Sequence, residues 1–182
     1  MSSTGAHAAL PAPFPWFGGK SRIADTVWDR FGDVPNFVDP FCGSLAILLR
    51  RPHWRLGEPW TRTETVNDIN AWLTNFWRAV RHEPDAVAAA ASDPVSELDL
   101  HARGNAIFYR DDWYQRRGHA SVDAWVEWLR DDPDHYDTQI AGWWVWGQCA
   151  SIGDNWNSGG HSARRDAQGM PCGICRSRPV TS

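Results

Sequence analysis

Apolar residues recur at helical spacing between Lys20 and Phe31. Ile23, Val27 and Phe31 stand four residues apart, which places their side chains on one face of a helix, and Gly32 follows directly. The pattern predicts a helix over this stretch that ends near Gly32.

A second pattern, in the letters NFVDPFCGS, is typical of a strand that runs into a turn. Phe37-Val38 indicates the end of a short buried strand. Pro40 prevents a simple helical continuation, and Gly43 permits a tight turn. Ser44 can then cap a helix over the letters SLAILLRR, which ends at Pro52.

The same arrangement returns in the letters ETVNDIN. Thr65-Val66 indicates a strand end, and Asn67 or Asp68 can cap the helix that follows. That helix carries apolar residues at spacings of three and four, namely Ile69, Trp72, Leu73, Phe76, Trp77 and Val80. The first 80 residues therefore predict helix, strand, helix, strand and helix, the opening of a parallel α/β sheet.

Strand signals fade from about Pro84 onward. The letters DAVAAAA and SVDAWVEWLR predict helices, and a tryptophan-dense apolar segment then leads into a loop of glycine, asparagine and serine. We expect four regions: a disordered leader over residues 1–12, an α/β part over 13–80, a helical region over 81–160 and a basic, flexible tail over 161–182.

Composition narrows the possible classes of protein. The length of 182 residues suits one domain. The net charge of -4 and the pI of about 5.9 argue against a protein that binds nucleic acid by charge alone, although they allow a local basic patch. The 13 tryptophans fit either a core or base stacking. We find no signal peptide and no membrane span, and we expect a cytoplasmic protein.

Two familiar motifs are excluded. The letters GGKS end like a phosphate loop, but Phe14 stands where that motif needs a glycine, and prolines precede it instead of a strand. Cys172 and Cys175 have zinc-knuckle spacing, but structural zinc takes four ligands and a second pair is lacking, so no metal is expected. Cys42 and Cys149 have apolar neighbours and are expected to pack as small hydrophobic residues.

Three polar positions could bind a small ligand. Lys20 is the only lysine in an arginine-rich chain, although the codon bias of a GC-rich genome is an alternative explanation for that. Asp39, at a strand end, can accept hydrogen bonds from an ammonium group, and Gly43 lets backbone approach a ligand. Asp68 ends the next strand, where carboxylates commonly bind ribose hydroxyls. Both acids can equally be turn or helix-capping residues.

Three fragments stand in order along the chain: WFGGK (Trp16 to Lys20), DPFCG (Asp39 to Gly43) and NDIN (Asn67 to Asn70). As a set they resemble the motifs of the Dam-like DNA adenine methyltransferases, including phage members, over about the first 80 residues. The resemblance implies an α/β, Rossmann-like methyltransferase fold, here with an incomplete sheet. It also implies methyl transfer from S-adenosylmethionine to the exocyclic amine of adenine in double-stranded DNA.

The resemblance implies roles for particular residues. Lys20 would lie near the methionyl end of S-adenosylmethionine, where a compact ammonium group suits a small carboxylate pocket. Asp68 would hold the ribose. The complete set of expected cofactor-binding residues is Trp16, Gly18, Gly19, Lys20, Asp39, Phe41, Gly43 and Asp68.

The resemblance also implies that the helical region would take the place of the family's target-recognition region. The arginines expected to meet DNA phosphates are Arg103, Arg110, Arg116 and Arg117. Asp111, Asp112 and Asp123 nearly cancel their charge, so a solvated helical face is an equal alternative. The tryptophans in the letters WWVW are expected to pack in the core.

One part of the family pattern is missing. Family members extrude the target adenine and hold it with Asp-Pro-Pro-Tyr or Asp-Pro-Pro-Phe, whereas this sequence contains no Pro-Pro pair. We therefore expect a chain that is C-terminally truncated or that takes the motif from a second polypeptide, and we assign no catalytic residue. A non-catalytic DNA-binding or decoy protein is the alternative function, and a poorly folding remnant is a third possibility.

Overall fold

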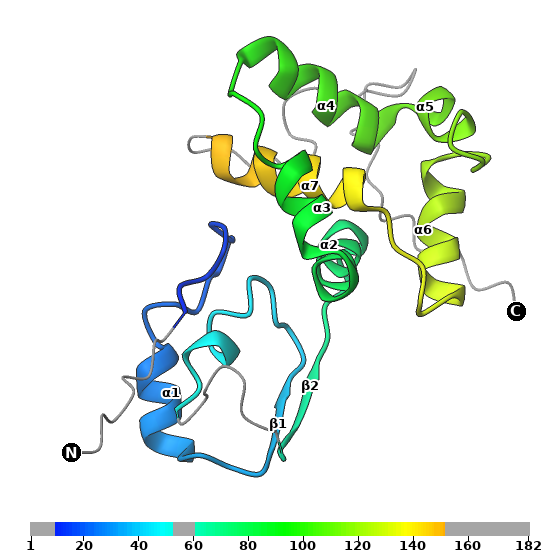
Figure 1. Ribbon diagram of the computed structural model, residues 1–182. Coiled ribbons are helices and arrows are strands. Elements are labelled where there is room, and N and C mark those ends of the chain that lie inside the picture. Colours follow the sequence, from blue (N-terminus) through cyan, green and yellow to red (C-terminus); the bar gives the residue numbers. More distant parts are fainter. Residues whose placement is uncertain (1–9, 53–60, 152–182) are drawn as a thin grey trace, which may run out of the picture.

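The computed structural model describes residues 10–52 and 61–151. Figure 1 shows two parts, with a small α/β part below a larger helical part. The α/β part contains α1 (Ala24–Phe31), β1 (Asn36–Asp39), the 3-10 helix η1 (Leu48–Arg50) and β2 (Thr63–Val66). The helical part contains α2 (Ala71–His82), α3 (Pro84–Ala90), α4 (Glu97–Tyr109), α5 (Asp111–Gln115), α6 (Val122–Asp131) and α7 (Thr138–Ala150).

The two strands form the parallel pair that the sequence predicts. Asn36 pairs with Thr63, and the register continues to Asp39 opposite Val66. Along β1, Phe37 and Asp39 are buried while Asn36 and Val38 are exposed, so the strand is buried on one face only and not at Val38 as predicted. The buried face packs against α1 and η1 in a small core of Ala24, Trp28, Phe37 and Ile47. The mixed helical and parallel-strand character of the prediction is therefore confirmed.

Helix α1 is shorter than predicted and turns a different face inward. It begins at Ala24 instead of Lys20, and Ile23 and Phe31 are more than half exposed. The buried positions are Ala24 and Trp28, whose ring centroid lies 4.7 Å from that of Phe37. The predicted face was wrong because the large indole, which can also donate a hydrogen bond, occupies the space between the strand and η1.

The α-helix predicted from Ser44 to Pro52 is absent; turns and the short η1 take its place. Gly43 and Leu45 both have positive φ, of 50° and 55°. A left-handed residue at Leu45 cannot belong to a right-handed helix, so Ser44 caps nothing. The segment is instead held by Arg51, a buried side chain with its guanidinium 3.3 Å from an oxygen of Asp33 and 3.1 Å from one of Glu64.

Helix α2 follows the predicted pattern, with a different cap. The side chain of Asn70, and not that of Asn67 or Asp68, accepts the hydrogen bond from the Leu73 amide, at 2.9 Å. Trp72, Leu73 and Phe76 are buried as the spacing predicts. Ile69 precedes the helix and is 94 % exposed, so it does not belong to the buried face.

The helical part has one extensive core. It joins residues from α2, α3, α4, α5, α6 and α7, and its fully buried large side chains include Trp125, Trp144 and Tyr114. Trp144 and Trp146 are buried as expected for the letters WWVW. Helices α3 and α7 approach closely at Gly142, where a Cβ atom would lie 2.4 Å from the Cβ of Ala90.

The N-terminal segment joins the two parts. Phe14 is buried among the rings of Phe76 and Trp144 in the helical core, at centroid distances of 5.3 and 5.1 Å. At the start of the same segment, the amide of Leu10 donates to the Leu49 carbonyl of η1 at 3.1 Å. This segment therefore contacts both the helical core and the α/β part.

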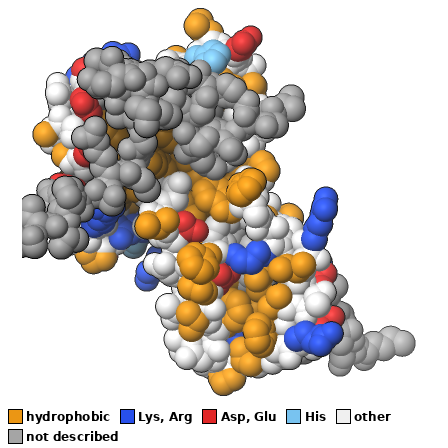
Figure 2. Space-filling view, turned by 180° about the vertical axis from the view of Figure 1, so that it is seen from behind, with side chains coloured by type: hydrophobic (Ala, Val, Ile, Leu, Met, Phe, Trp, Pro, Cys, Tyr) orange, Lys and Arg blue, Asp and Glu red, His pale blue; other side chains and the backbone are white. Residues whose placement is uncertain are grey.

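The α/β part exposes several hydrophobic side chains. Figure 2 shows hydrophobic side chains spread over the α/β part in the view from behind. Exposed apolar side chains of this part include Val38, Phe41 and Val66, which belong to the strands or follow β1. Within residues 10–52 and 61–151, no helix has the length and apolar character needed to cross a membrane.

Candidate functional site

The loops after β1 and β2 lie against each other because the strands are parallel and in register. The Asn67 amide donates to the Asp39 carbonyl, and the Cys42 amide donates to the Asn67 carbonyl, both at 2.9 Å. The Asn67 side chain donates to the Pro40 carbonyl at 3.1 Å. The two strand ends thus form one hydrogen-bonded unit.

Asp68 fastens this unit at its centre. One carboxylate oxygen accepts the Gly43 amide at 3.1 Å, and the other accepts the Asn70 amide, also at 3.1 Å. Hydrogen bonds to a charged group contribute about 1.5–3 kcal/mol each. Asp68 is therefore a structural link between the two loops, and it is not the helix cap that the sequence also allowed.

Lys20 meets the same unit from the N-terminal segment. Its ammonium group lies 3.5 Å from a carboxylate oxygen of Asp39 and donates to the Phe41 carbonyl. The same Asp39 oxygen accepts the Phe41 amide at 3.2 Å. The structure thus brings together Lys20, Asp39, Gly43 and Asp68, which come from three separate stretches of the sequence.

The glycines and Trp16 shape the entry to this site. Gly18 has φ of +70°, and the Gly19 amide donates to the Trp16 carbonyl at 2.9 Å, which makes a tight turn before Lys20. A Cβ atom on Gly43 would lie 2.6 Å from the Trp16 indole. Gly43 is therefore required by the packing of Trp16, a reason the sequence did not reveal. The Phe41 side chain is 77 % exposed.

The electrostatics of the site are dominated by its acids. Asp39 is buried, and its second carboxylate oxygen has no hydrogen-bond partner among the described residues. Burial, followed by the negative charges of Asp68 and Asp39, raises the pKa of the Cys42 thiol to about 11, against a smaller lowering effect of Lys20. Cys42 therefore stays protonated and is a poor nucleophile at neutral pH. Cys149 is exposed, contrary to expectation.

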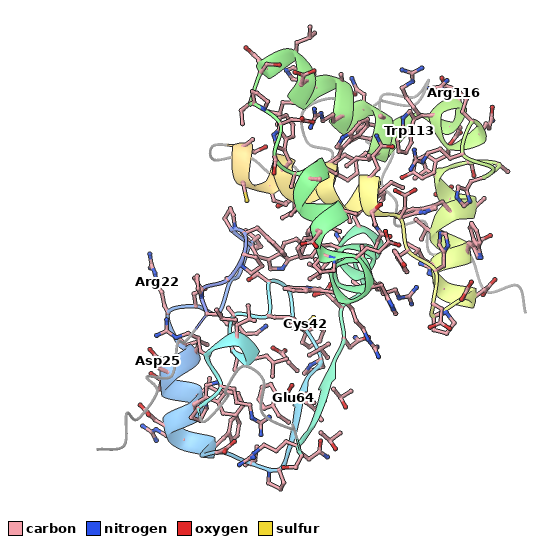
Figure 3. All side chains as sticks on the ribbon, in the orientation of Figure 1. Arg22, Asp25, Cys42, Glu64, Trp113 and Arg116 are labelled. Atoms are coloured by element: carbon pink, nitrogen blue, oxygen red, sulfur yellow. The ribbon has the colours of Figure 1, made fainter. Side chains whose placement is uncertain are left out.

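A cavity of about 260 Å³ opens beside Asp68. Figure 3 labels Cys42 at the junction of the two parts, where this cavity lies. Its lining residues are Cys42, Val66, Asn67, Asp68, Leu73, Thr74, Trp77, Arg78 and Arg81. Trp77 also donates its indole N–H to the Gly43 carbonyl at 3.0 Å. Trp77, Arg78 and Arg81 were not predicted as site residues; their shared helix face was the available signal.

The four arginines predicted to contact DNA lie elsewhere, and each faces an acid. Arg103 pairs with Asp93 at 2.7 Å and stacks over Trp146 at 4.4 Å. Arg110 and Arg116 both pair with Asp112, at 2.5 and 3.1 Å.

Arg117 pairs with Asp137 at 2.5 Å. Figure 3 shows Arg116 at the far end of the helical part from Cys42. The two hydrogen-bonded guanidinium groups of Arg110 and Arg116 lower the pKa of Asp112 to about 2. The structure therefore does not bring this group of arginines to the strand ends.

No group of three or more potential metal ligands is found within the described residues, and Cys172 and Cys175 lie outside them.

Comparison with known proteins gives one informative result. The family model for D12 class N6 adenine-specific DNA methyltransferases matches residues 16–134, which begin at Trp16 and include all three motifs. Curated proteins and solved structures give no match. Because the model covers more than half of the chain, this protein belongs to the D12 class N6 adenine-specific DNA methyltransferase family.

Proposed function

We propose that the chain binds S-adenosylmethionine where β1 and β2 end, as the cofactor half of a Rossmann-like DNA adenine methyltransferase. The observation that carries this proposal is the Asp68 carboxylate. It joins the Gly43 turn to the start of α2 and lines the cavity beside them. A strand-tip acid beside a glycine turn is the arrangement that binds a ribose in nucleotide-binding α/β folds.

The residues present fit such a ligand. Each Asp68 oxygen accepts one backbone N–H and retains acceptor capacity for a hydroxyl group. The unpartnered oxygen of Asp39 is a buried acceptor next to the Lys20 ammonium group. The cavity of about 260 Å³ is slightly smaller than usual small-molecule sites of roughly 300–1,000 Å³, so part of the ligand would lie outside it.

S-adenosylmethionine supplies an electrophilic methyl group on a sulfonium when it is bound. The chain's own residues would bind and orient it: Asp68 through the ribose hydroxyls, and Lys20 with Asp39 near the methionyl end. The exposed side chain of Phe41 would line the cofactor turn. Lys20 already balances the Asp39 charge, which lowers the cost of burying that carboxylate.

The sequence has no Asp-Pro-Pro motif, the element by which family members accept the hydrogens of the adenine amine. We propose that the groups for this step lie outside the given sequence, in a continuation of the chain or on a second polypeptide. Methyl incorporation into double-stranded DNA would then require them, whereas cofactor binding would not.

Equilibrium dialysis with labelled S-adenosylmethionine tests the cofactor site. Asp68→Asn keeps the size of the side chain but removes its charge, so we expect affinity to fall by about tenfold or more. Asp123→Asn changes an exposed acid in the first turn of α6 and should bind as the unaltered chain does. Circular dichroism of both variants checks that the fold is retained.

Absence of binding by the unaltered chain would refute the cofactor assignment. DNA binding without cofactor binding or methyl incorporation would instead support a non-catalytic DNA-binding protein. Gel-shift measurements with and without S-adenosylmethionine separate these outcomes.

A further inference from the structure

The cavity beside Asp68 has an acidic end and a basic end. Asp68 lies where β2 gives way to α2, while Arg78 and Arg81 come from the last turns of α2. Leu73, Thr74, Trp77, Arg78 and Arg81 follow the spacing of a single helical face, and all line the cavity. At about 1.5 Å per residue, the seven steps from Thr74 to Arg81 extend about 10 Å along the helix axis. The cavity therefore extends from the strand ends to Arg78 and Arg81.

Arg78 is held in place by main-chain acceptors. One of its guanidinium nitrogens donates to the carbonyls of Leu129, Asp132 and His135, at 2.9, 3.0 and 3.1 Å. These acceptors are neutral, and no carboxylate pairs with Arg78 within the described ranges. Its position is thus fixed by neutral groups, and none of the described carboxylates forms an ion pair with it.

Arg81 stands one turn further along and has greater freedom. Its side chain is exposed, and within residues 10–52 and 61–151 no hydrogen bond or ion pair engages it. In contrast, each of Arg103, Arg110 and Arg117 contacts an aspartate. At the cavity, the Arg81 side chain is available to an external anion.

We propose that Arg81, supported by the fixed charge of Arg78, binds a backbone phosphate of the DNA substrate at the rim of this cavity. The inference rests on the proposed function, because it places the DNA strand beside the methyl-donor site. Guanidinium groups offer paired N–H donors that match phosphate oxygens, and positive charge at phosphates supplies much of the affinity for DNA. The four arginines predicted to contact DNA, by contrast, each pair with an aspartate.

Arg81 could instead bind the carboxylate of S-adenosylmethionine. Two measurements on one variant distinguish this carboxylate from a DNA phosphate. Fluorescence anisotropy with a labelled double-stranded oligonucleotide gives DNA affinity at several salt concentrations. Equilibrium dialysis gives the affinity for S-adenosylmethionine. Arg81→Gln removes the charge and shortens the side chain by two atoms, while it retains an amide that can form hydrogen bonds.

Arg130→Gln is the matched control. Arg130 is also exposed in the last turn of its helix, α6, and the described residues provide it with no partner. Both arginines experience the favourable field at a helix C-terminus, so the two substitutions should affect helix stability alike. A difference in DNA binding between them therefore reports the cavity and not the helix.

We expect Arg81→Gln to weaken DNA binding about tenfold and to lower the slope of log affinity against log salt by about one, with unchanged S-adenosylmethionine binding. Arg130→Gln should match the unaltered chain in both measurements. The inference is overturned if the unaltered chain does not bind DNA, if Arg81→Gln has no effect, or if both variants weaken binding equally. Loss of S-adenosylmethionine binding alone would assign the site to the donor's carboxylate instead. Failure of Asp68→Asn to affect cofactor binding would count against the cofactor site separately.

Discussion

The α/β part and the helical part are stabilised in different ways. Among the described residues, the α/β core has 4 buried members, whereas the helical core has 17. The α/β part depends on polar links: Arg51 with Asp33 and Glu64, and Asp68 with Gly43 at the strand ends. Most of the hydrophobic stabilisation therefore lies in one part, while the family motifs lie in the other.

This contrast implies that the α/β part relies on its neighbour. A two-stranded sheet is marginal in isolation. The Phe14 side chain sits in the helical core, and Trp77 of α2 donates to the Gly43 carbonyl, so the candidate site is attached to the helical part at two points. Loss of the helical core should disrupt both parts, while damage to the α/β part should stay local.

The largest effect is expected for Trp144→Ala. Trp144 is fully buried and contacts the rings of Phe14, Trp16 and Phe76, so its removal leaves a large cavity. We expect a loss of about 3–5 kcal/mol in unfolding free energy, measured by denaturant titration with circular dichroism. Trp128→Ala, at a side chain 43 % exposed, should cost clearly less. Equal losses would contradict the leading role of the helical core.

The next effect is expected for Arg51→Met, which removes the buried cation beneath the sheet. The carboxylates of Asp33 and Glu64 lose their shared partner, although Asp33 keeps Arg62. We expect a local destabilisation of about 2–4 kcal/mol, at the lower end of the usual cost of breaking a buried ion pair, because Asp33 retains one cationic partner. The rate of Cys42 alkylation, with Cys149, Cys172 and Cys175 replaced by serine, measures local opening. A faster rate with an unchanged helical unfolding transition is the expected result.

Gly43→Ala should have a smaller effect at the same site. Its Cβ atom would collide with the Trp16 indole, and the residue has φ of +50°. Such overpacking costs about 1–3 kcal/mol. We expect Cys42 alkylation to accelerate and the Trp16 ring to be displaced, with the helical transition retained. Gly32→Ala, which has a similar φ of +66° but open space around its Cβ, separates backbone strain from the collision. Equal effects of both variants would argue against the packing explanation.

The smallest effect concerns pH and the helical part. Burial lowers the pKa of His119 and His135 from their ordinary value of 6.5, and their rings lie 5.9 Å apart around Trp128. Near and below pH 6.5 the unfolded chain binds more protons at these histidines than the folded chain does. The two neutral histidines therefore contribute to the free energy of unfolding above pH 6.5, and this contribution is lost as the pH falls through their lowered pKa values. Denaturant midpoints at about pH 7.5 and about pH 5.5 measure the loss. Replacing both histidines with glutamine should reduce the difference between the midpoints.

Sequence reasoning succeeded where local pattern decides the structure. The parallel strands follow from short apolar pairs that run into turn residues, and the buried positions of α2 follow from helical spacing. The meeting of Gly43 with Asp68 follows because parallel strands end at one edge of a sheet. The contact of Lys20 with Asp39 does not follow from strand order, because Lys20 comes from the segment before α1; it is expected only from the resemblance of the three motifs.

It failed where distant residues decide. The inward face of α1 depends on space for Trp28 between Phe37 and η1, which no local spacing indicates. Leu45 adopts positive φ against its own preference, and this breaks the predicted helix. The availability of Arg103 depends on Asp93 and on Trp146 of α7, and neither contact is visible in the residues around it.

The double attachment of Asp68 has one more consequence. If Asp68 also binds the ribose, ligand binding and the stability of the two loops are linked through one side chain. A bound nucleoside would then slow the separation of the two loops, and loosening of either loop would weaken nucleoside binding. A substitution of Asp68 would disturb both the loop and the ligand, so a change in the preferred methyl donor would have to come from substitutions at neighbouring side chains.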